Sequence, residues 1–309
     1  MTKYPISVVM CVYNGSKHLG EAIESILNQS FKDFEFIIVN DCSTDDSKDI
    51  IENYSDKRII LINNEENIGL TKSLNKALTY VRGKYIARMD SDDIALPDRF
   101  GKQYDFMENN PDVAVCGSWF EVFGAASFIK RHPISHDEIC VELLNDSPIG
   151  HPTVLMRKES FDEHNITYDE TFTSAQDYDL WTRTFKKLKF HNLPEVLLMY
   201  RFHQAQVSSN SGSKQRKFGD QIRHRLYSEF CEKESDIELI DAFIHGKKGS
   251  VSCLKQVDQL IDTILLRNTK LDLFNQKILE GFFRGRFCNC ILYAKGFNPQ
   301  IWFFFVFLP

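Results

Sequence analysis

The sequence predicts an α/β fold, in which a parallel sheet carries helices on both faces, followed by a mainly helical C-terminal region. Three observations support this prediction. Strand and helix signals alternate over the first ~130 residues. The strand signals are continuous apolar runs rich in β-branched residues, as expected for strands covered on both faces. After residue 213, apolar residues recur at helical spacing.

The N-terminal part alternates in a regular order. Strands are expected at residues 6–13, 34–39, 58–63 and 85–89, each a short apolar run. Helices are expected at residues 17–29 and 70–81, where apolar side chains recur every three or four positions. Between them, a helix that ends near Tyr54 is expected, with Ser43, Thr44 or Asp45 as its capping residue.

After Pro97 the alternation loosens. Helices are expected at residues 98–109, 136–144 and 175–187, and strands at 113–123 and 196–202. The polar segment at residues 208–213 is interpreted as a linker, and the chain beyond it as mainly helical. The predicted domains are therefore residues 1–210, with halves at 1–95 and 96–210, and residues 211–309.

Composition excludes several classes of protein. The chain has 309 residues, a formal charge of −6 and 43% hydrophobic residues, which excludes a disordered, collagen-like or coiled-coil protein. Net acidity disfavours nucleic acid as a partner. The charge is uneven, with a net −10 before Lys214 and +4 from there to Pro309. The eight cysteines form no CxxC pair and are interpreted as reduced thiols of a cytoplasmic protein that has no signal peptide.

Polar residues follow three of the predicted strands, at the edge where parallel α/β sheets bind ligands. These are the segments at residues 11–14, 40–43 and 90–93. The first has no GxGxxG, which disfavours a dinucleotide site, and the chain has no GxxxxGK[ST] phosphate loop.

The segment Asp90-Ser91-Asp92-Asp93 carries the strongest chemical signal. Three carboxylates in four residues repel one another, so a pre-formed cluster of this kind favours a bound cation. Mn²⁺ or Mg²⁺ is expected, because these ions combine one or two carboxylates with substrate phosphates. The alternative is a solvated acidic turn.

The motifs resemble those of the inverting family 2 glycosyltransferases. The resemblance rests on ISVVMCVYNGSKHLGEAIESILNQSF, FEFIIVNDCSTDDS, NIGLTKSLNKAL, GKYIARMDSDDIALPDRF, AQDYDLWTR and YRFHQAQVSS, which occur in family order over about two thirds of the chain. It implies the GT-A (nucleotide-diphospho-sugar transferase) fold and a UDP-sugar donor. ARMDSDDIALPD, GSWFEV and YRFHQAQVSS are most similar to bacterial enzymes of lipooligosaccharide and O-antigen synthesis, several of them β-1,3-transferases.

The resemblance assigns roles to individual residues. Asp41 is expected to accept a hydrogen bond from the uracil imide. Asp92 is expected to bind the metal, and His203 to complete its ligands unless it is an ordinary packed histidine. The nucleotide-sugar set comprises Cys11, Tyr13, Asp41, Lys72, Arg88, Asp90 and Ser91, although Lys72 and Arg88 are equally explained as solvated charges.

Asp177 is the expected catalytic base. An inverting transfer needs one carboxylate that takes the proton of the acceptor hydroxyl, and Asp177 begins a helix with apolar residues on its other side. A helix N-cap is the alternative, and Asp179 is the second candidate for the base. Gln176 stands where Glu is frequent in the family, and Cys42 replaces the usual Gly, so the turn at Cys42 is expected to differ.

The acceptor side and the tail are less marked. His151 and Trp119 are expected near the acceptor, with Trp119 equally explained as a core residue. The segments at residues 282–287 and 301–308 interleave basic and aromatic residues. They predict peripheral contact with the cytoplasmic face of the inner membrane, unless the tail packs back on the helical region or forms a dimer contact.

The expected function is transfer of a hexose or N-acetylhexosamine from a UDP-sugar to a glycan acceptor in surface polysaccharide synthesis. The acceptor is expected on undecaprenyl diphosphate or on a lipid A core. The alternatives are a sugar-nucleotidyltransferase and a non-catalytic sugar-nucleotide-binding protein of the same fold. A nucleotidyltransferase needs a Gly-rich, basic loop after the first strand, which residues 13–16 do not provide.

Overall fold

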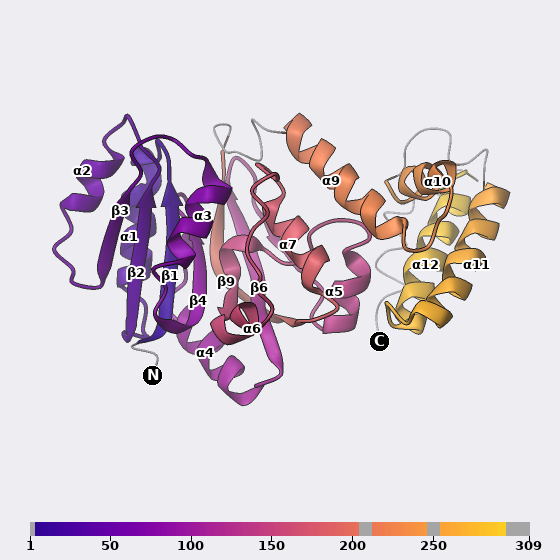
Figure 1. Cartoon of the computed structure of the whole chain (residues 1–309), viewed down its shortest axis with the longest axis horizontal. Helices are drawn as coiled ribbons and strands as arrows, with labels where there is room; N and C mark the ends of the chain where they lie inside the picture. The colour runs from indigo at the N-terminus through magenta and orange to yellow at the C-terminus, as the bar shows by residue number, and fades with distance from the viewer. Residues whose placement is uncertain (1–3, 204–211, 246–253, 295–309) are drawn as a thin grey trace. The chain divides into compact units, whose positions relative to one another are not determined.

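The computed structural model describes residues 4–203, 212–245 and 254–294 (Figure 1). The chain divides into two compact units. The first comprises Met1–Ile139 and Ser147–Gly219, and the second comprises Cys140–Asp146 and Asp220–Pro309. The predicted linker at residues 208–213 lies largely outside the described residues, so the predicted domain boundary stays a prediction.

The first unit begins with four parallel strands in the order β3-β2-β1-β4. They are β1 (Tyr4–Val12), β2 (Phe34–Asn40), β3 (Ile59–Asn63) and β4 (Gly83–Asp90). In the register of this sheet, Cys11 lies beside Asp90 and Val12 beside Asn40. The three polar segments identified in the sequence therefore follow neighbouring strand ends at one edge of the sheet, as predicted.

Helices cover both faces of these strands (Figure 1). Side chains that alternate along β1, including Ile6, Val8 and Met10, pack in one core with α1 (Ser16–Leu27) and α4 (Arg99–Asn109). On the other face, α3 (Leu70–Leu78) contacts β1 and β2. The short helix α2 (Ser47–Glu52) packs on α1.

The second half of the unit extends the same sheet but is not wholly parallel. Strand β8 (Leu155–Arg157) runs antiparallel between β4 and β6 (Val113–Gly124). Strands β5 (Ile94–Ala95) and β7 (Phe128–Lys130) are also antiparallel to their neighbours, whereas β6 and β9 (Lys189–Phe202) pair in parallel. The expectation of a parallel sheet is thus confirmed for β1 to β4 and wrong for these three short strands.

The remaining elements of the first unit are short. They are α5 (His136–Glu142), which ends in the second unit, the 3₁₀ turn His151–Thr153, α6 (Lys158–Glu163) and α7 (Gln176–Thr184). Strand β9 starts seven residues earlier than predicted. Its pairing with β6 is irregular between Leu193 and Val196, where Pro194 has no N–H to donate. The proline therefore interrupts the signal of one long strand.

The second unit is helical, as predicted. It contains the end of α9 (Gly212–Tyr227) and the helices α10 (Glu234–Ile244), α11 (Leu254–Leu271) and α12 (Gln276–Ala294). The predicted apolar stripes form its core, with Ile240 and Phe243 from α10 and Val257 and Ile261 from α11 buried. None of the described helices combines the length and the apolar character needed to cross a bilayer.

Part of the predicted membrane segment packs inside this unit. Phe282 and Phe283 of α12 are buried, and Arg284 forms ion pairs with Asp258 and Asp262. The guanidinium of Arg286 lies 3.7 Å from the centre of the Phe282 ring. Residues 282–286 therefore pack on the helical region, which was the alternative to membrane contact. Residues 301–308, the other part of the prediction, lie outside the described residues.

Candidate active site

Hydrogen bonds lock the loops after β1 and β2 together. The backbone N–H groups of Thr44 and Ser16 donate to Asn14 Oδ1 (2.8 Å) and Asp45 Oδ2 (2.9 Å), respectively. Burial raises the pKa of Asp45, but hydrogen bonds from Ser47 and Ser16 outweigh burial and lower it to about 2. The predicted helix cap is therefore corrected in part: Asp46 is the N-cap of α2, while Asp45 also accepts from the N–H of Ser47.

Asp41 is buried beneath the loop at residues 64–69. Its Oδ1 accepts hydrogen bonds from Asn64 Nδ2 (2.7 Å) and the backbone of Ile68 (3.0 Å), and its Oδ2 accepts one from Gly69 (2.8 Å). A carboxylate offers about four acceptor positions. Among the described residues, one position on Oδ2 is thus left for a further donor.

The three acids after β4 converge as a metal site requires. One ligand atom from each of Asp90, Asp92 and Asp93 lies within 4.8 Å of the others. Asp90 is ion-paired with Arg88, a buried residue of β4. Asp93 is fully buried; its Oδ1 accepts from the backbone of Arg201 (2.8 Å), and its Oδ2 has no partner in the described structure.

Burial shapes the ionisation of this cluster. Burial raises the pKa of Asp93 well above its usual range, and the neighbouring Asp90 and Asp92 raise it further. The pKa of Asp90 is also raised by burial, and Arg88 opposes that rise. Carboxylates that are costly to ionise together, with one unpartnered buried oxygen, fit a divalent cation that takes oxygen ligands.

The end of β9 lies against the acid cluster. His203 Nε2 lies 3.0 Å from Asp92 Oδ2, and Arg201 Nε donates to the carbonyl of Asp92 (2.8 Å). A second nitrogen of Arg201 forms an ion pair with Glu21 of α1 (2.6 Å). The structure therefore brings together Asp92 and His203, the two residues predicted as metal ligands, across more than a hundred residues of sequence.

Asp177 lies in the first turn of α7 and is half-buried. Its Oδ2 accepts a hydrogen bond from Ser147 Oγ (3.2 Å). Ala175, which precedes the helix, has a positive φ of 56°, a strained conformation for a residue with a Cβ atom. The second candidate, Asp179, is fully buried and ion-paired with Arg183 (2.7 Å), so it supports the helix from within.

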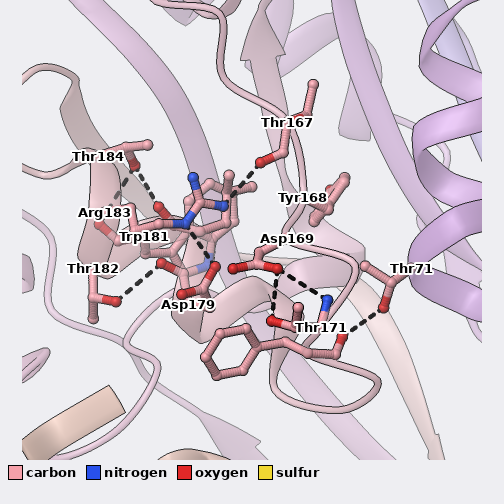
Figure 2. A network of polar contacts seen from close by, with 12 residues as sticks. Thr71, Thr167, Tyr168, Asp169, Thr171, Asp179, Trp181, Thr182, Arg183 and Thr184 are labelled. Atoms are coloured by element: carbon pink, nitrogen blue, oxygen red, sulfur yellow. Dashed lines mark hydrogen bonds and ion pairs between the residues drawn. The ribbon is translucent and has the colours of Figure 1, made fainter. Parts of the chain in front are cut away.

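A polar network fixes α7 against the loop that precedes it. Figure 2 shows Arg183 between Asp179 and the carbonyl of Thr167, to which it donates at 2.8 Å. In the same loop, Asp169 accepts from Thr171, and Thr71 of α3 donates to the carbonyl of Phe172 (Figure 2). The helix that carries Asp177 is thus tied through this loop to α3.

Tyr168 also belongs to this region of the structure, although it was not predicted from the sequence. Its Oη lies 2.8 Å from His151 Nε2, and both side chains are buried. Burial raises the pKa of Tyr168, and the charges of Arg88, Asp177, Cys11 and Asp90 all influence it. No short motif contains Tyr168, so only the spatial contacts reveal it.

The other predicted residues occupy more peripheral places. Cys11 is partly buried, and burial raises the pKa of its thiol to about 12, with Arg88, Asp41 and Asp90 as charged neighbours. Tyr13 is half exposed, Lys72 is exposed on α3, and Ser91 is partly buried between the acids. Trp119 donates through Nε1 to the carbonyl of His132 (2.9 Å). Among the described residues, no hydrogen bond or ion pair joins Tyr13, Lys72 or Trp119 to the acid cluster.

Solved structures with the same architecture define the class of fold. Staphylococcus aureus TarS 1–349 in complex with UDP-GlcNAc is similar with a TM-score of 0.61 and 18% identity, over 95% of this chain and 92% of that one. The mannosyltransferase PcManGT from Pyrobaculum calidifontis, in complex with GDP-Man and Mn²⁺, has a TM-score of 0.57 and 13% identity, over 93% and 87%. The first unit therefore has the GT-A fold, as predicted.

Sequence comparison then identifies the family. The family model "Glycosyl transferase family 2" matches residues 7–175. An uncharacterized glycosyltransferase of Haemophilus influenzae is 32% identical over 90% of this chain and 96% of its own. The O-antigen biosynthesis glycosyltransferase WbnJ of Escherichia coli is 35% identical over 67% of this chain and 83% of its own. The chain belongs to glycosyl transferase family 2.

Proposed function

We propose that this chain is an inverting glycosyltransferase that moves a hexose or N-acetylhexosamine from a UDP-sugar to a hydroxyl group of a glycan. The convergence of Asp90, Asp92 and Asp93 with His203 at the sheet edge is the observation that carries the proposal. Such a cluster suits a cation beside a sugar diphosphate. The UDP-GlcNAc bound by TarS and the Mn²⁺ bound by PcManGT support a UDP-sugar and a divalent cation.

Asp92 and His203 would hold Mn²⁺ or Mg²⁺, and Asp90 would face the ribose and diphosphate. When bound, the cation supplies positive charge that stabilises the nucleoside diphosphate as a leaving group. Arg201 donates a hydrogen bond to the backbone carbonyl of Asp92. This bond positions the loop at residues 90–93 before any ligand binds. The remaining acceptor position of Asp41 Oδ2 matches the ring N–H of uracil, with Cys11 and Tyr13 beside the base and Lys72 near the donor phosphates.

Asp177 would act as the catalytic base. One of its oxygens is held by Ser147, and the carboxylate lies at the start of α7, where the helix dipole favours its ionised form. The base takes the proton of the acceptor hydroxyl as that oxygen attacks the anomeric carbon from the side opposite UDP. One displacement inverts the configuration, and the proton leaves on Asp177.

The acceptor is proposed as a sugar on a lipid carrier, either undecaprenyl diphosphate or lipid A core, at the cytoplasmic face of the inner membrane. The likeness to WbnJ supports a role in O-antigen or related surface polysaccharides, and a β-1,3 linkage is the product proposed. Trp119 is the proposed acceptor contact, whereas the burial of His151 favours a supporting role over direct contact.

Substitution of the base separates catalysis from binding. Asp177→Asn should bind UDP-sugar with Mn²⁺ as the wild type does, while turnover falls by about 10²- to 10⁴-fold, the usual contribution of a general base. Binding is measured by calorimetry, and turnover with UDP-Glc, UDP-Gal, UDP-GlcNAc and UDP-GalNAc on a synthetic lipid-diphosphate sugar, with NMR of the product. Unchanged turnover would refute the role of Asp177.

The same assay tests the metal and the remaining alternative. Asp92→Asn should abolish the Mn²⁺ dependence of UDP binding, and a chelator should stop transfer by the wild type. If the wild type binds UDP-sugars with Mn²⁺ yet transfers none of the four sugars to any acceptor offered, the non-catalytic binding protein is the better description.

A further inference from the structure

Arg88 is buried with two nitrogens that have no partner. The side chain is 4% exposed, and its Nη2 forms the ion pair with Asp90. Nε and Nη1 have no hydrogen-bond partner in the described structure. An unsatisfied buried N–H group costs about 1–3 kcal/mol. The arrangement is therefore explained most simply if these two groups face an oxygen atom of a ligand.

Tyr168 is close enough to Arg88 for their charges to interact, and it is held from two directions. Its backbone N–H and carbonyl both bind the side-chain amide of Asn75 on α3, at 3.0 Å each. Its Oη meets His151 Nε2 at 2.8 Å. A phenol group can donate one hydrogen bond and accept others, so the contact with His151 leaves Oη able to bind a further partner in either tautomer of the histidine.

This pair interacts with both the acid cluster and Asp177. Arg88 is ion-paired with Asp90, and Tyr168 is close enough to both Asp90 and Asp177 for their charges to act on its hydroxyl. If the proposed function holds, the diphosphate lies at the acids and the acceptor hydroxyl at Asp177. The sugar that is transferred must lie between them.

We propose that Arg88 and Tyr168 form a buried polar subsite that binds hydroxyl groups of the transferred sugar, with His151 as the positioning residue behind Tyr168. The inference rests on the proposed function, and it concerns recognition of the sugar rather than the nucleotide. Asp90 already balances the charge of Arg88, so the free N–H groups suit neutral hydroxyls better than a further phosphate.

The test compares UDP with UDP-sugar in the full-length chain. Binding of UDP and of the four UDP-sugars is measured by calorimetry with Mn²⁺ for the wild type, Tyr168→Phe and His151→Phe. Tyr168→Phe should weaken binding of the preferred UDP-sugar by about tenfold, as expected for one or two lost hydrogen bonds. The affinity for UDP should change by less than about twofold. Tyr54→Phe is the matched control, because it removes a hydroxyl that bonds the carbonyl of Gly20 (3.4 Å) and the side chain of Glu24, and neither belongs to the proposed subsite.

Deoxygenated donors identify the contact itself. Four UDP-sugars, each lacking the hydroxyl group at position 2, 3, 4 or 6, are compared. The wild type should bind one of the four more weakly than the intact donor, and Tyr168→Phe should bind that donor and the intact donor equally well. His151→Phe should behave like Tyr168→Phe, and the double variant should show no further loss, because the two residues act as one unit.

Three results overturn the inference. They are equal weakening of UDP and UDP-sugar, unchanged sugar binding in Tyr168→Phe, and additive effects of the two substitutions. Failure of the proposed function looks different, because the wild type would then bind neither UDP nor any UDP-sugar with Mn²⁺. Arg88→Lys keeps a positive charge beside Asp90 but removes the N–H groups of the guanidinium that have no partner among the described residues. It should weaken binding of the UDP-sugar more than binding of UDP.

Discussion

Cys42 adopts a backbone conformation that suits glycine. Its φ of 57° lies in the left-handed region, which costs a residue with a Cβ atom about 1–2 kcal/mol. Cys42→Gly should therefore raise the free energy of unfolding, by about 0.5–1 kcal/mol after the greater freedom of glycine in the unfolded chain is allowed for. Thermal unfolding measures the change.

A matched variant separates strain from the thiol contact. Cys42 Sγ lies 3.5 Å from the carbonyl of Glu65. Cys42→Ala loses that contact but keeps the Cβ atom, so it should be no more stable than the wild type. Stabilisation by alanine equal to that by glycine would show that strain at this turn is not the cause.

Asp45 makes stability depend on pH in the acid range. Its pKa of about 2 in the folded protein is below its ordinary value of 3.8. The stabilisation that it supplies is therefore complete above pH 4 and is lost as the pH falls toward 2. Asp45→Asn should lower the unfolding free energy at pH 7 by about 1–2 kcal/mol, and the difference from the wild type should shrink at pH 3. Urea unfolding at both values checks this, and an equal gap at the two pH values contradicts it.

Residues with local signals were the ones that the sequence could predict. The cluster of Asp90, Asp92 and Asp93 could be predicted because these residues are neighbours in the chain. In the structure, one oxygen atom of each lies within 4.8 Å of the others. Tyr168 has no such signal. Its importance comes from contacts with Asn75 and His151, and nothing in the chain order indicates that these three meet.

At the scale of elements, an ion pair between the partly exposed Arg183 and the fully buried Asp179 stabilises α7. Arg183 joins Asp179 of the same helix to the carbonyl of Thr167. Arg183→Gln removes one ion-pair partner of the fully buried Asp179 carboxylate and should destabilise the protein by about 1–3 kcal/mol. The double variant Asp179→Asn/Arg183→Gln should cost less than the sum of the single variants. A double-mutant cycle in urea measures the coupling, and strict additivity would mean that the pair contributes nothing.

The strands that sequence could not predict are those that depend on pairing. Strands β1 to β4 are buried apolar runs, so the local sequence is sufficient to predict them. Strands β7 and β8 have three residues each, and they are strands because β6 and β4 offer hydrogen-bonding edges beside them. Those edges are defined only after the sheet has formed, so no local pattern indicates the antiparallel order.

At the scale of the molecule, membrane contact now rests on the last residues alone. Arg284 and Arg286 are engaged inside the helical unit, so removal of α12 would damage its core. A truncation that removes residues 295–309 keeps α10, α11 and α12 in the chain. If the tail binds membrane, this truncation should lower recovery with anionic vesicles in flotation by several-fold, since apolar and basic groups both contribute.

A second variant keeps the tail but removes three of its aromatic side chains. Substitution of the phenylalanines at 303, 304 and 305 by serine should reproduce the effect of the truncation. Full recovery of both variants with the vesicles would end the membrane hypothesis.

The short strand β8 has a mechanical consequence. It pairs with β4 on one side and β6 on the other, so a single sheet runs from β1–β4 to β9, whose end leads into His203. Two lobes on a hinge could close on a substrate; a continuous sheet resists bending. Under the proposed function, the distance from donor to acceptor is therefore set by the stiffness of the sheet, and adjustment to substrates of different length is left to the loops at its edge.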